Sequence, residues 1–432
     1  MEHMTKALLA LIEKSPSPFH AAANLAGELE AAGYVRLREE EPWTLARGGR
    51  YFVERNGSSL LAFRAPQGEW RGFLLTAAHS DSPSFKLKPQ GELTGPENYL
   101  RLNTEPYGGM LMSTWLDRPL SVAGRAVVRT ERGIESRLVD VDRDLLVIPS
   151  VAIHMNREAN RGHAWDPKTD LTPLLGLGTE KGVLRRLIAE AAAISEEDLL
   201  GGDLFLYLRQ PGTVLGAKRE LVAGPRLDDL QCAFACFHGF LEAEEGGGMP
   251  VFCLFDNEEV GSATRQGADG TFLQEVLGRI CAALGRDCPA ELAASVMVSA
   301  DNAHAVHPNH PEYADGGHRP RLNGGVVVKH SASQRYTTDA VSGALFREIC
   351  RRAGVPTQEF ANRSDLPGGS TLGNISNTHV SLTTVDVGLA QLAMHSAWET
   401  AGAEDTGYLL RAAGAFYGSV LRPDGQGGWE IR

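Results

Sequence analysis

Apolar residues are spaced with two different periods in the second half of the chain. Short apolar runs typical of buried strands occur at 250–255, 294–301 and 323–330, with another strand near 380–385. The stretches between and after them have the wider spacing of amphipathic helices, at 229–245, 270–284, 339–353 and 402–419. Strands that alternate with helices form a mostly parallel sheet covered by helices on both faces. The pattern therefore predicts an α/β fold.

The first 88 residues mix the same two periods. Leu8, Leu9 and Leu11 predict an amphipathic N-terminal helix. The segment "YFVERNGSSLLAFRAP" has two apolar runs around Asn56 and Gly57, which favours a hairpin. A further strand is expected in "GFLLTAAHSDSP".

The character of the chain changes between about 90 and 222. β-type segments such as "RAVVRT" and "LLVIPS" are separated by turns rich in Gly, Pro and Asn, and one helix is expected near 180–193. We therefore expect a β-rich insertion at 91–222 that interrupts an α/β domain formed by 1–90 and 223–432.

The composition of the chain argues against several classes of function. The 432 residues are 43% hydrophobic and carry a formal charge of −12, which argues against a nucleic-acid groove or an anionic membrane surface as partner. No run of about 18 apolar residues predicts a transmembrane helix, and the N-terminus lacks a signal-peptide pattern. The six cysteines form no C-x-x-C pair, so buried free thiols in a reducing cytoplasm are expected.

Acidic residues and histidines gather where the apolar runs end. In an open α/β sheet, ligands bind beyond the carboxyl ends of strands, so such side chains should meet at one edge. They are His79 and Asp81 in "LLTAAHSDS", Asp228 in "GPRLDDL", Glu258 and Glu259 in "FDNEEVGS", Asp301, His304, His307 and His310 in "VMVSADNAHAVHPNH", and His395 in "LAMHSAWET".

Oxygen and imidazole ligands without thiolates suit Zn, Mn or Co in a catalytic site. Two adjacent glutamates point in different directions, so one can bind a metal while the other takes a proton from water. Taken singly, each set has an ordinary alternative: a capping His-Asp pair, a solvated helix start, or a loop of hydrogen-bonding histidines. Their recurrence at strand ends favours a metallohydrolase.

These motifs, together with "SQRYTTDA" and "GGSTLGNI", resemble in order and context those of the M18 aminopeptidases, the aspartyl aminopeptidase group. The resemblance covers essentially the whole chain. It implies a three-layer α/β/α metallopeptidase domain that holds two divalent metals, most often Zn. It also implies that the β-rich insertion is a dimerisation domain and that the protein is a dodecamer built from dimers.

The resemblance also implies roles for individual residues. Asp228 would bridge the metals, with His79 and Glu259 on one ion and Asp301 and His395 on the other. Glu258 would be the general base, and Asp81 would orient His79. His304 and Lys329 would line the substrate pocket, and His154 would enter a neighbouring subunit's site. The chain departs from the family in having Asp229 where Asn often follows the bridging aspartate.

We therefore expect a cytoplasmic two-metal aminopeptidase that acts on peptides with a free N-terminus. Because the chain is acidic, a preference for N-terminal Asp or Glu would need a local cation, for which Lys329 at the end of a strand is the candidate. Relatives that prefer neutral residues leave this preference open. Two alternatives are an N-acyl amino acid deacylase and a non-enzymatic assembly protein with a decayed site.

Overall fold

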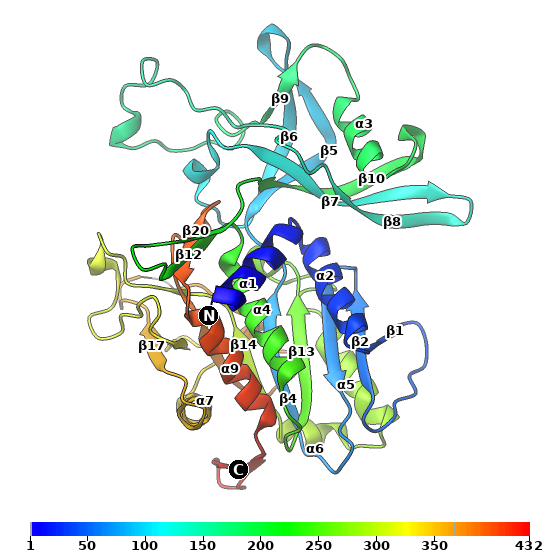
Figure 1. The fold of residues 1–432 in the computed structure, drawn as a ribbon, viewed down its shortest axis with the longest axis vertical. Coiled ribbons are helices and arrows are strands. Elements are labelled where there is room, and N and C mark those ends of the chain that lie inside the picture. The colour runs from blue at the N-terminus through cyan, green and yellow to red at the C-terminus, as the bar shows by residue number, and fades with distance from the viewer. Residues whose placement is uncertain (1, 367) are drawn as a thin grey trace.

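A nine-stranded sheet forms the centre of the larger part of the molecule (Figure 1). The computed structural model describes residues 2–366 and 368–432. In spatial order the strands are β1 (Val35–Leu37), β2 (Arg50–Arg55), β3 (Ser59–Arg64), β13 (Met249–Phe255), β4 (Phe73–His79), β14 (Val296–Ala300), β18 (Thr383–Gly388), β16 (Val326–His330) and β17 (Thr357–Ala361). The four neighbours β13, β4, β14 and β18 are parallel, so their carboxyl ends meet at one edge.

Helices cover both faces of this sheet, as expected from the alternating pattern. One face packs against α1 (Glu2–Lys14), α2 (Pro18–Ala31), α4 (Leu227–Glu242), α7 (Ala340–Arg352) and α9 (Asp405–Gly418). The other packs against α5 (Phe272–Ala283), α6 (Cys288–Ala293) and α8 (Leu372–Ser376). Along β13, Phe252 and Leu254 point into the first core and Val251 and Cys253 into the second. The three-layer α/β/α prediction is confirmed.

A second sheet of six strands stands beyond the carboxyl edge of the first (Figure 1). Its spatial order is β8 (Gly133–Asp140), β7 (Leu120–Thr130), β10 (Leu199–Leu208), β5 (Ser84–Thr94), β6 (Tyr99–Tyr107) and β9 (Leu174–Leu177), all antiparallel, with α3 (Val183–Ala191) beside it. We call residues 84–208 the insertion. The segment "LLVIPS" was expected to be a strand, but it makes only isolated bridges to three different segments, since Pro149 lacks the N–H of a continuing ladder.

A third, small sheet joins the two parts. It contains β11 (Thr213–Leu215), β12 (Leu221–Gly224), β20 (Glu399–Gly402), β19 (Ala390–Leu392) and β15 (Ala303–His304). A hairpin of β21 (Leu421–Pro423) and β22 (Trp429–Ile431) ends the chain. The boundaries at 91 and 222 therefore fall inside strands: the second sheet starts earlier, and β12 pairs with a strand from near the C-terminus.

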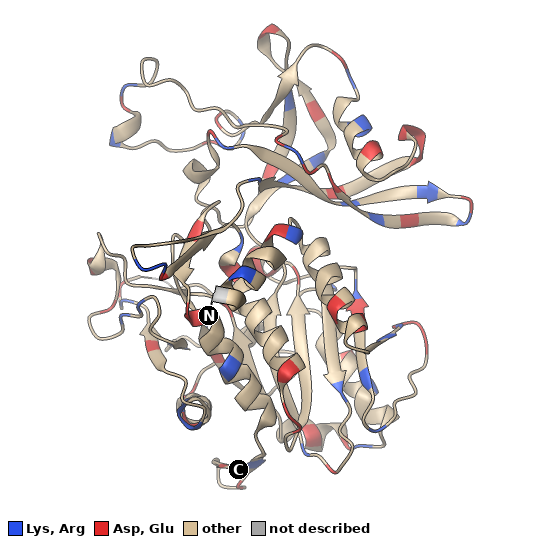
Figure 2. Ribbon diagram, in the orientation of Figure 1, with Lys and Arg blue, Asp and Glu red and all other residues tan. Residues whose placement is uncertain are grey.

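Lys and Arg positions are interspersed with Asp and Glu positions along the ribbon (Figure 2). Among the described helices, none is long and apolar enough to cross a membrane. All six cysteines are free thiols, and Cys288 is the only one that is not buried.

Candidate metal centre

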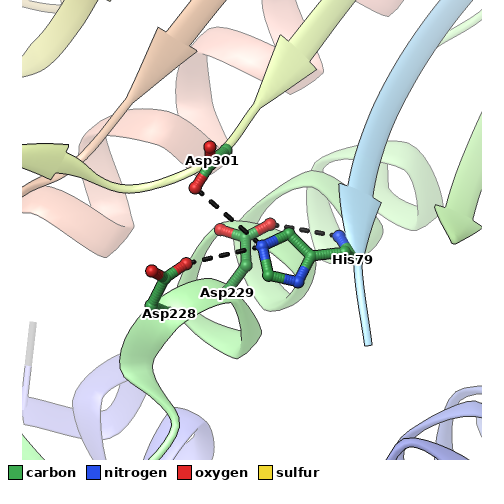
Figure 3. A group of neighbouring side chains, drawn as sticks. All are labelled: His79, Asp228, Asp229 and Asp301. Carbon is green, nitrogen blue, oxygen red and sulfur yellow. Dashed lines mark hydrogen bonds and ion pairs between the residues drawn. The ribbon is translucent and has the colours of Figure 1, made fainter. Parts of the chain in front are cut away.

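His79 is the last residue of β4 and is almost completely buried. Its Nε2 lies 3.5 Å from Oδ1 of Asp228 and 3.9 Å from Oδ1 of Asp301 (Figure 3). Asp301 directly follows β14, the parallel neighbour of β4, and Asp228 lies at the start of α4. The adjacent carboxyl ends of two strands and one helix start therefore bring three possible ligands together.

A second group lies on the other side of Asp228. Nε2 of His395 is 3.5 Å from Oδ2 of Asp228 and 3.4 Å from Oε2 of Glu259. Asp228 thus faces one group with each of its two carboxylate oxygens. Glu258 and Glu259 also lie near His79, all three offering ligand atoms within 4.8 Å of one another.

This grouping differs from the one that the resemblance implied. His79 lies with Asp301, and His395 lies with Glu259, on opposite oxygens of Asp228. The distances therefore favour this grouping over the implied pairing of His79 with Glu259 and of Asp301 with His395, although Glu259 also lies near His79. The reason is spatial: β4 and β14 are neighbours in the sheet, whereas His395 reaches the site from the small third sheet.

The charges at this edge suit divalent cations. Burial raises the pKa of Glu258 to about 8, and the neighbouring carboxylates Asp301 and Asp81 add to the rise. Burial and then the charge of Asp228 raise the pKa of Glu259. Within the described residues, Oδ1 of Asp228 and Oε1 of Glu259 are buried without a hydrogen-bond donor. Buried carboxylates without partners are costly unless they bind cations, so the residues present fit a metal centre.

Asp229 was noted in the sequence only as a departure from the family. Its Oδ2 accepts a hydrogen bond of 3.1 Å from the backbone N–H of His79 (Figure 3). It is fully buried and belongs to the group of possible ligands around His79. Its position directly after Asp228 was the available signal, but its side-chain direction could not be read from the sequence.

Asp81 connects His79 with the two glutamates. Nδ1 of His79 donates to the backbone carbonyl of Asp81 at 3.1 Å and lies 3.3 Å from its Oδ1. The same Oδ1 accepts the backbone N–H of Glu258 at 3.1 Å. Its Oδ2 accepts the N–H of Glu259 at 3.2 Å and the hydroxyl of Tyr107 at 2.7 Å. Asp81 is therefore placed to orient the imidazole, and it fixes the turn that carries both glutamates.

Glu399, at the start of β20, was not recognised in the sequence. Its Oε2 accepts the backbone N–H of Asp228 at 3.0 Å, and its Oε1 accepts the N–H of His395 at 2.8 Å. The side chain is 2% exposed, and burial raises its pKa to about 8. One carboxylate thus ties together the backbone of two candidate ligands. Nothing in "MHSAWET" distinguishes this glutamate from a surface one.

A cavity opens beside these groups. It is lined by Asp228, Glu258, Asp301 and His395, and also by His304, Lys329, Tyr336, Phe360 and Thr371. Nζ of Lys329 is 3.3 Å from Oδ2 of Asp301, and the side chain is buried. β16 runs antiparallel to β18, so it does not share the strand direction that brings His79 and Asp301 to the site. Lys329 is nevertheless placed on the cavity wall.

His154 lies away from this cavity, in an exposed loop of the insertion next to Ile153 and Met155. His307 and His310 form a surface pair with ring centroids 5.4 Å apart, and Nδ1 of His310 is 2.9 Å from Glu312. The structure therefore separates these three histidines from the candidate centre.

A three-layer α/β/α domain with two His–carboxylate groups around a shared aspartate defines a class of metal-dependent hydrolases. The chain belongs to the M18 peptidase family, whose model, described as aminopeptidase I zinc metalloprotease, matches residues 11–417. The protein is therefore a metalloaminopeptidase, a hydrolase of peptides. This favours the aminopeptidase over the deacylase and over the non-enzymatic assembly protein.

Individual relatives agree with this assignment. A probable M18 family aminopeptidase 2 of Clostridium acetobutylicum is 43% identical over 423 residues, which is 95% of this chain and 98% of that protein. The cryo-EM structure of the Ape4 and Nbr1 complex contains a similar chain, with a TM-score of 0.93 and 34% identity over 96% of this chain and 85% of that one. The S. cerevisiae mApe1 dodecamer has a TM-score of 0.85 and 30% identity, covering 96% and 97% of the two chains.

Proposed function

We propose that this aminopeptidase uses two divalent metal ions and releases single N-terminal residues from peptides. The observation that carries the proposal is that Asp228 presents one oxygen to each of two His–carboxylate groups. Asp228 would bridge the ions, with His79 and Asp301 completing one site and Glu259 and His395 the other. Imidazole and carboxylate ligands suit Zn, with Mn or Co as alternatives.

Bound ions would supply Lewis acidity toward the scissile carbonyl and toward the attacking water. The chain supplies the proton transfers. Glu258 borders the cavity, and its backbone is held by Asp81. We assign it as the general base, which takes a proton from water at its carboxylate and passes it to the leaving amine nitrogen. The acidic side chains around the cavity suit the α-ammonium group of a substrate, which restricts cleavage to chain ends.

Glu258→Gln tests this assignment. The amide has the same size but cannot accept the proton, so metal content should stay at the wild-type level while kcat falls by about 10²–10⁴-fold. Metal content would be measured by elemental analysis and kcat with an aminoacyl anilide. An N-acetylated amino acid serves as the control substrate and should not be hydrolysed. Wild-type turnover in the metal-loaded variant would contradict the role of Glu258.

We further propose a preference for N-terminal Asp or Glu, mediated by Lys329. Among the described residues that line the cavity, Lys329 is the only lysine or arginine. Because Lys329 also contacts Asp301, Lys329→Met should lower activity on all substrates, so the informative quantity is a ratio. The ratio of kcat/KM for an aspartyl over a leucyl substrate should fall at least about tenfold, as expected for a truncated buried charge pair. An unchanged ratio would exclude Lys329 as the determinant.

The assembly is also proposed from similarity. The relative mApe1 is described as a dodecamer, and we propose the same state for this chain, with the insertion as dimerisation domain. His154 would then enter a neighbouring subunit's cavity, which its position on an exposed insertion loop supports. His304 would contact substrate from its place on the cavity wall. Unpaired cysteines support a cytoplasmic location.

A further inference from the structure

A short segment of the insertion, residues 107–114, lies against the candidate metal centre of its own chain. It begins at Tyr107, the last residue of β6, and ends before β7. The backbone N–H of Leu111 donates to the carbonyl of His395 at 2.9 Å, and the N–H of Ala397 donates to the hydroxyl of Thr114 at 2.9 Å. The insertion is therefore hydrogen-bonded to the loop that carries one of the two candidate histidine ligands.

Tyr107 reaches the other histidine through Asp81. Its hydroxyl donates to Oδ2 of Asp81 at 2.7 Å and accepts from Nδ2 of Asn257 at 2.9 Å. Burial, with the charge of Asp81, raises the pKa of Tyr107, so the phenol remains a donor at neutral pH. Its ring packs edge-to-face on Phe205 of β10, with centroids 5.3 Å apart. Tyr107 and Phe205 form a small buried cluster with Phe19 of α2, which fixes the hydroxyl that holds Asp81 beside His79.

The two residues after Tyr107 act through the backbone. The carbonyl of Gly109 accepts a hydrogen bond of 2.7 Å from Nδ1 of His395. Gly108 has φ +78°, and a Cβ there would lie 3.1 Å from Cβ of Glu259. Only glycine combines this backbone conformation with such a close approach. The segment therefore contacts Glu259 and His395, the candidate ligands of the second group.

Both imidazoles are held in the same way. Nδ1 of His79 donates to the backbone carbonyl of Asp81 and also lies 3.3 Å from its Oδ1, and Nδ1 of His395 donates to the backbone carbonyl of Gly109. Each Nε2 is therefore directed at Asp228. A partner on the second ring nitrogen fixes the tautomer and orientation of a metal-binding histidine. We propose that segment 107–114 is a positioning element for both histidines, with Tyr107 acting through Asp81. This inference rests on the proposed two-metal function, and it gives the insertion a role inside its own subunit.

Tyr107→Phe tests the inference because it removes only the hydroxyl. Tyr207→Phe is the matched control, since Tyr207 is also a buried tyrosine of the insertion whose hydroxyl donates to a carboxylate, Asp140, at 2.7 Å. Zn²⁺ dissociation constants would be measured on full-length, metal-free protein by competition with a chromophoric chelator. Tyr107→Phe should weaken binding about tenfold, and Tyr207→Phe less than about twofold. Equal values for both variants would overturn the proposal.

A double-mutant cycle separates positioning from general destabilisation. If Tyr107 acts through Asp81, then Tyr107→Phe should have a much smaller effect on Zn²⁺ affinity in an Asp81→Asn background. Sedimentation should show an unchanged oligomer for Tyr107→Phe. An undiminished effect in the Asp81→Asn background would contradict the proposed route. Fewer than two ions per wild-type chain would instead contradict the two-metal proposal itself.

Discussion

Single buried side chains hold the backbone of the candidate ligands, and Glu399 is the clearest case. Glu399→Gln replaces one carboxylate oxygen with an NH₂ group, so either Asp228 or His395 loses the acceptor for its backbone N–H. We expect Zn²⁺ affinity to fall about tenfold, measured by chelator competition.

Glu291→Gln is the control for this prediction. Glu291 is equally buried and accepts the backbone N–H of Gly72 at 2.7 Å. It lies on α6, whereas Glu399 holds the start of α4, and these two helices cover opposite faces of the sheet. Both variants should lose stability, and only Glu399→Gln should lose metal affinity. Equal Zn²⁺ affinities of the two variants would show that Glu399 has no role in the metal centre.

Among single residues, the sequence predicted the position of those that directly follow a strand. His79, Asp301 and Glu259 could be found because parallel strands deliver their last residues to one edge. Glu399, Tyr107 and Gly109 could not, because each acts through a hydrogen bond to a residue far away in the chain. The grouping of the candidate ligands could not be read from the sequence for a related reason, since no local pattern shows which oxygen of Asp228 faces which imidazole.

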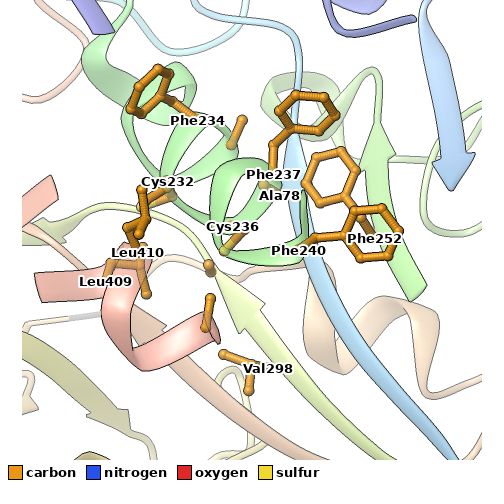
Figure 4. Close-up of a cluster of buried hydrophobic side chains, with 14 of the residues drawn as sticks. Ala78, Cys232, Phe234, Cys236, Phe237, Phe240, Phe252, Val298, Leu409 and Leu410 are labelled. Carbon is orange, nitrogen blue, oxygen red and sulfur yellow. The ribbon is translucent and has the colours of Figure 1, made fainter. Parts of the chain in front are cut away.

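Helices and strands were predicted well where the spacing of apolar residues along the chain matches the face that packs into the core. In α4, Phe237 and Phe240 pack against Phe252 of β13 (Figure 4), and the predicted helix at 229–245 differs by only a few residues. Asn56 and Gly57 have φ of 60° and 67°, as a tight hairpin turn between β2 and β3 requires. α2 was not predicted as a separate helix, although Ser17 caps it and Pro18 is its first residue.

α2 also gives a prediction about pH. Burial, with the charge of Arg226, lowers the pKa of His20 below 6.5, although Asp140 opposes the shift. Well above pH 6.5, His20 is neutral in both the folded and the unfolded state. As the pH falls further, only the unfolded state takes up the proton readily, so the free energy of unfolding should decrease.

His20→Gln should reduce this dependence. The loss of thermal midpoint between about pH 7.5 and about pH 5.5 should be smaller in the variant than in the wild type. Ser17, whose Oγ is 2.8 Å from Nδ1 of His20, can still hydrogen-bond the glutamine. An identical loss in both proteins would show that His20 does not contribute to acid sensitivity.

For the whole molecule, removal of metal should be destabilising. The side chains gathered at the sheet edge are mostly acidic: Asp81, Asp228, Asp229, Glu258, Glu259, Asp301 and Glu399. Bound cations would relieve their repulsion and stabilise the fold by about 4 kcal/mol per site at a thousandfold excess over Kd. Chelation should therefore lower the thermal midpoint, and added Zn²⁺ should restore it. A midpoint unaffected by chelation would argue against the metal centre.

The proposed assembly can be tested on the loop that carries His154. Met155 is 85% exposed, and Ile153 beside it is 48% exposed. Because exposed apolar residues that cluster mark interaction surfaces, Met155→Asp should give a smaller species in analytical ultracentrifugation. Val35→Asp is the control, since Val35 is an isolated exposed residue of β1 in the α/β domain. A wild-type protein that sediments as a monomer would contradict the proposed dodecamer.

The position of segment 107–114 limits how such chains can be recombined. By sequence the segment belongs to the insertion, whereas its hydrogen bonds belong to the edge of the central sheet. Crossovers placed at 84 and 208, the ends of the insertion, would combine segment 107–114 of one protein with the hydrogen-bond partners of another, Asp81 and His395 being replaced by that protein's residues. A functional chimaera must therefore inherit Tyr107, Gly108 and Gly109 together with compatible partners. The insertion and the α/β domain therefore cannot be exchanged independently between such proteins.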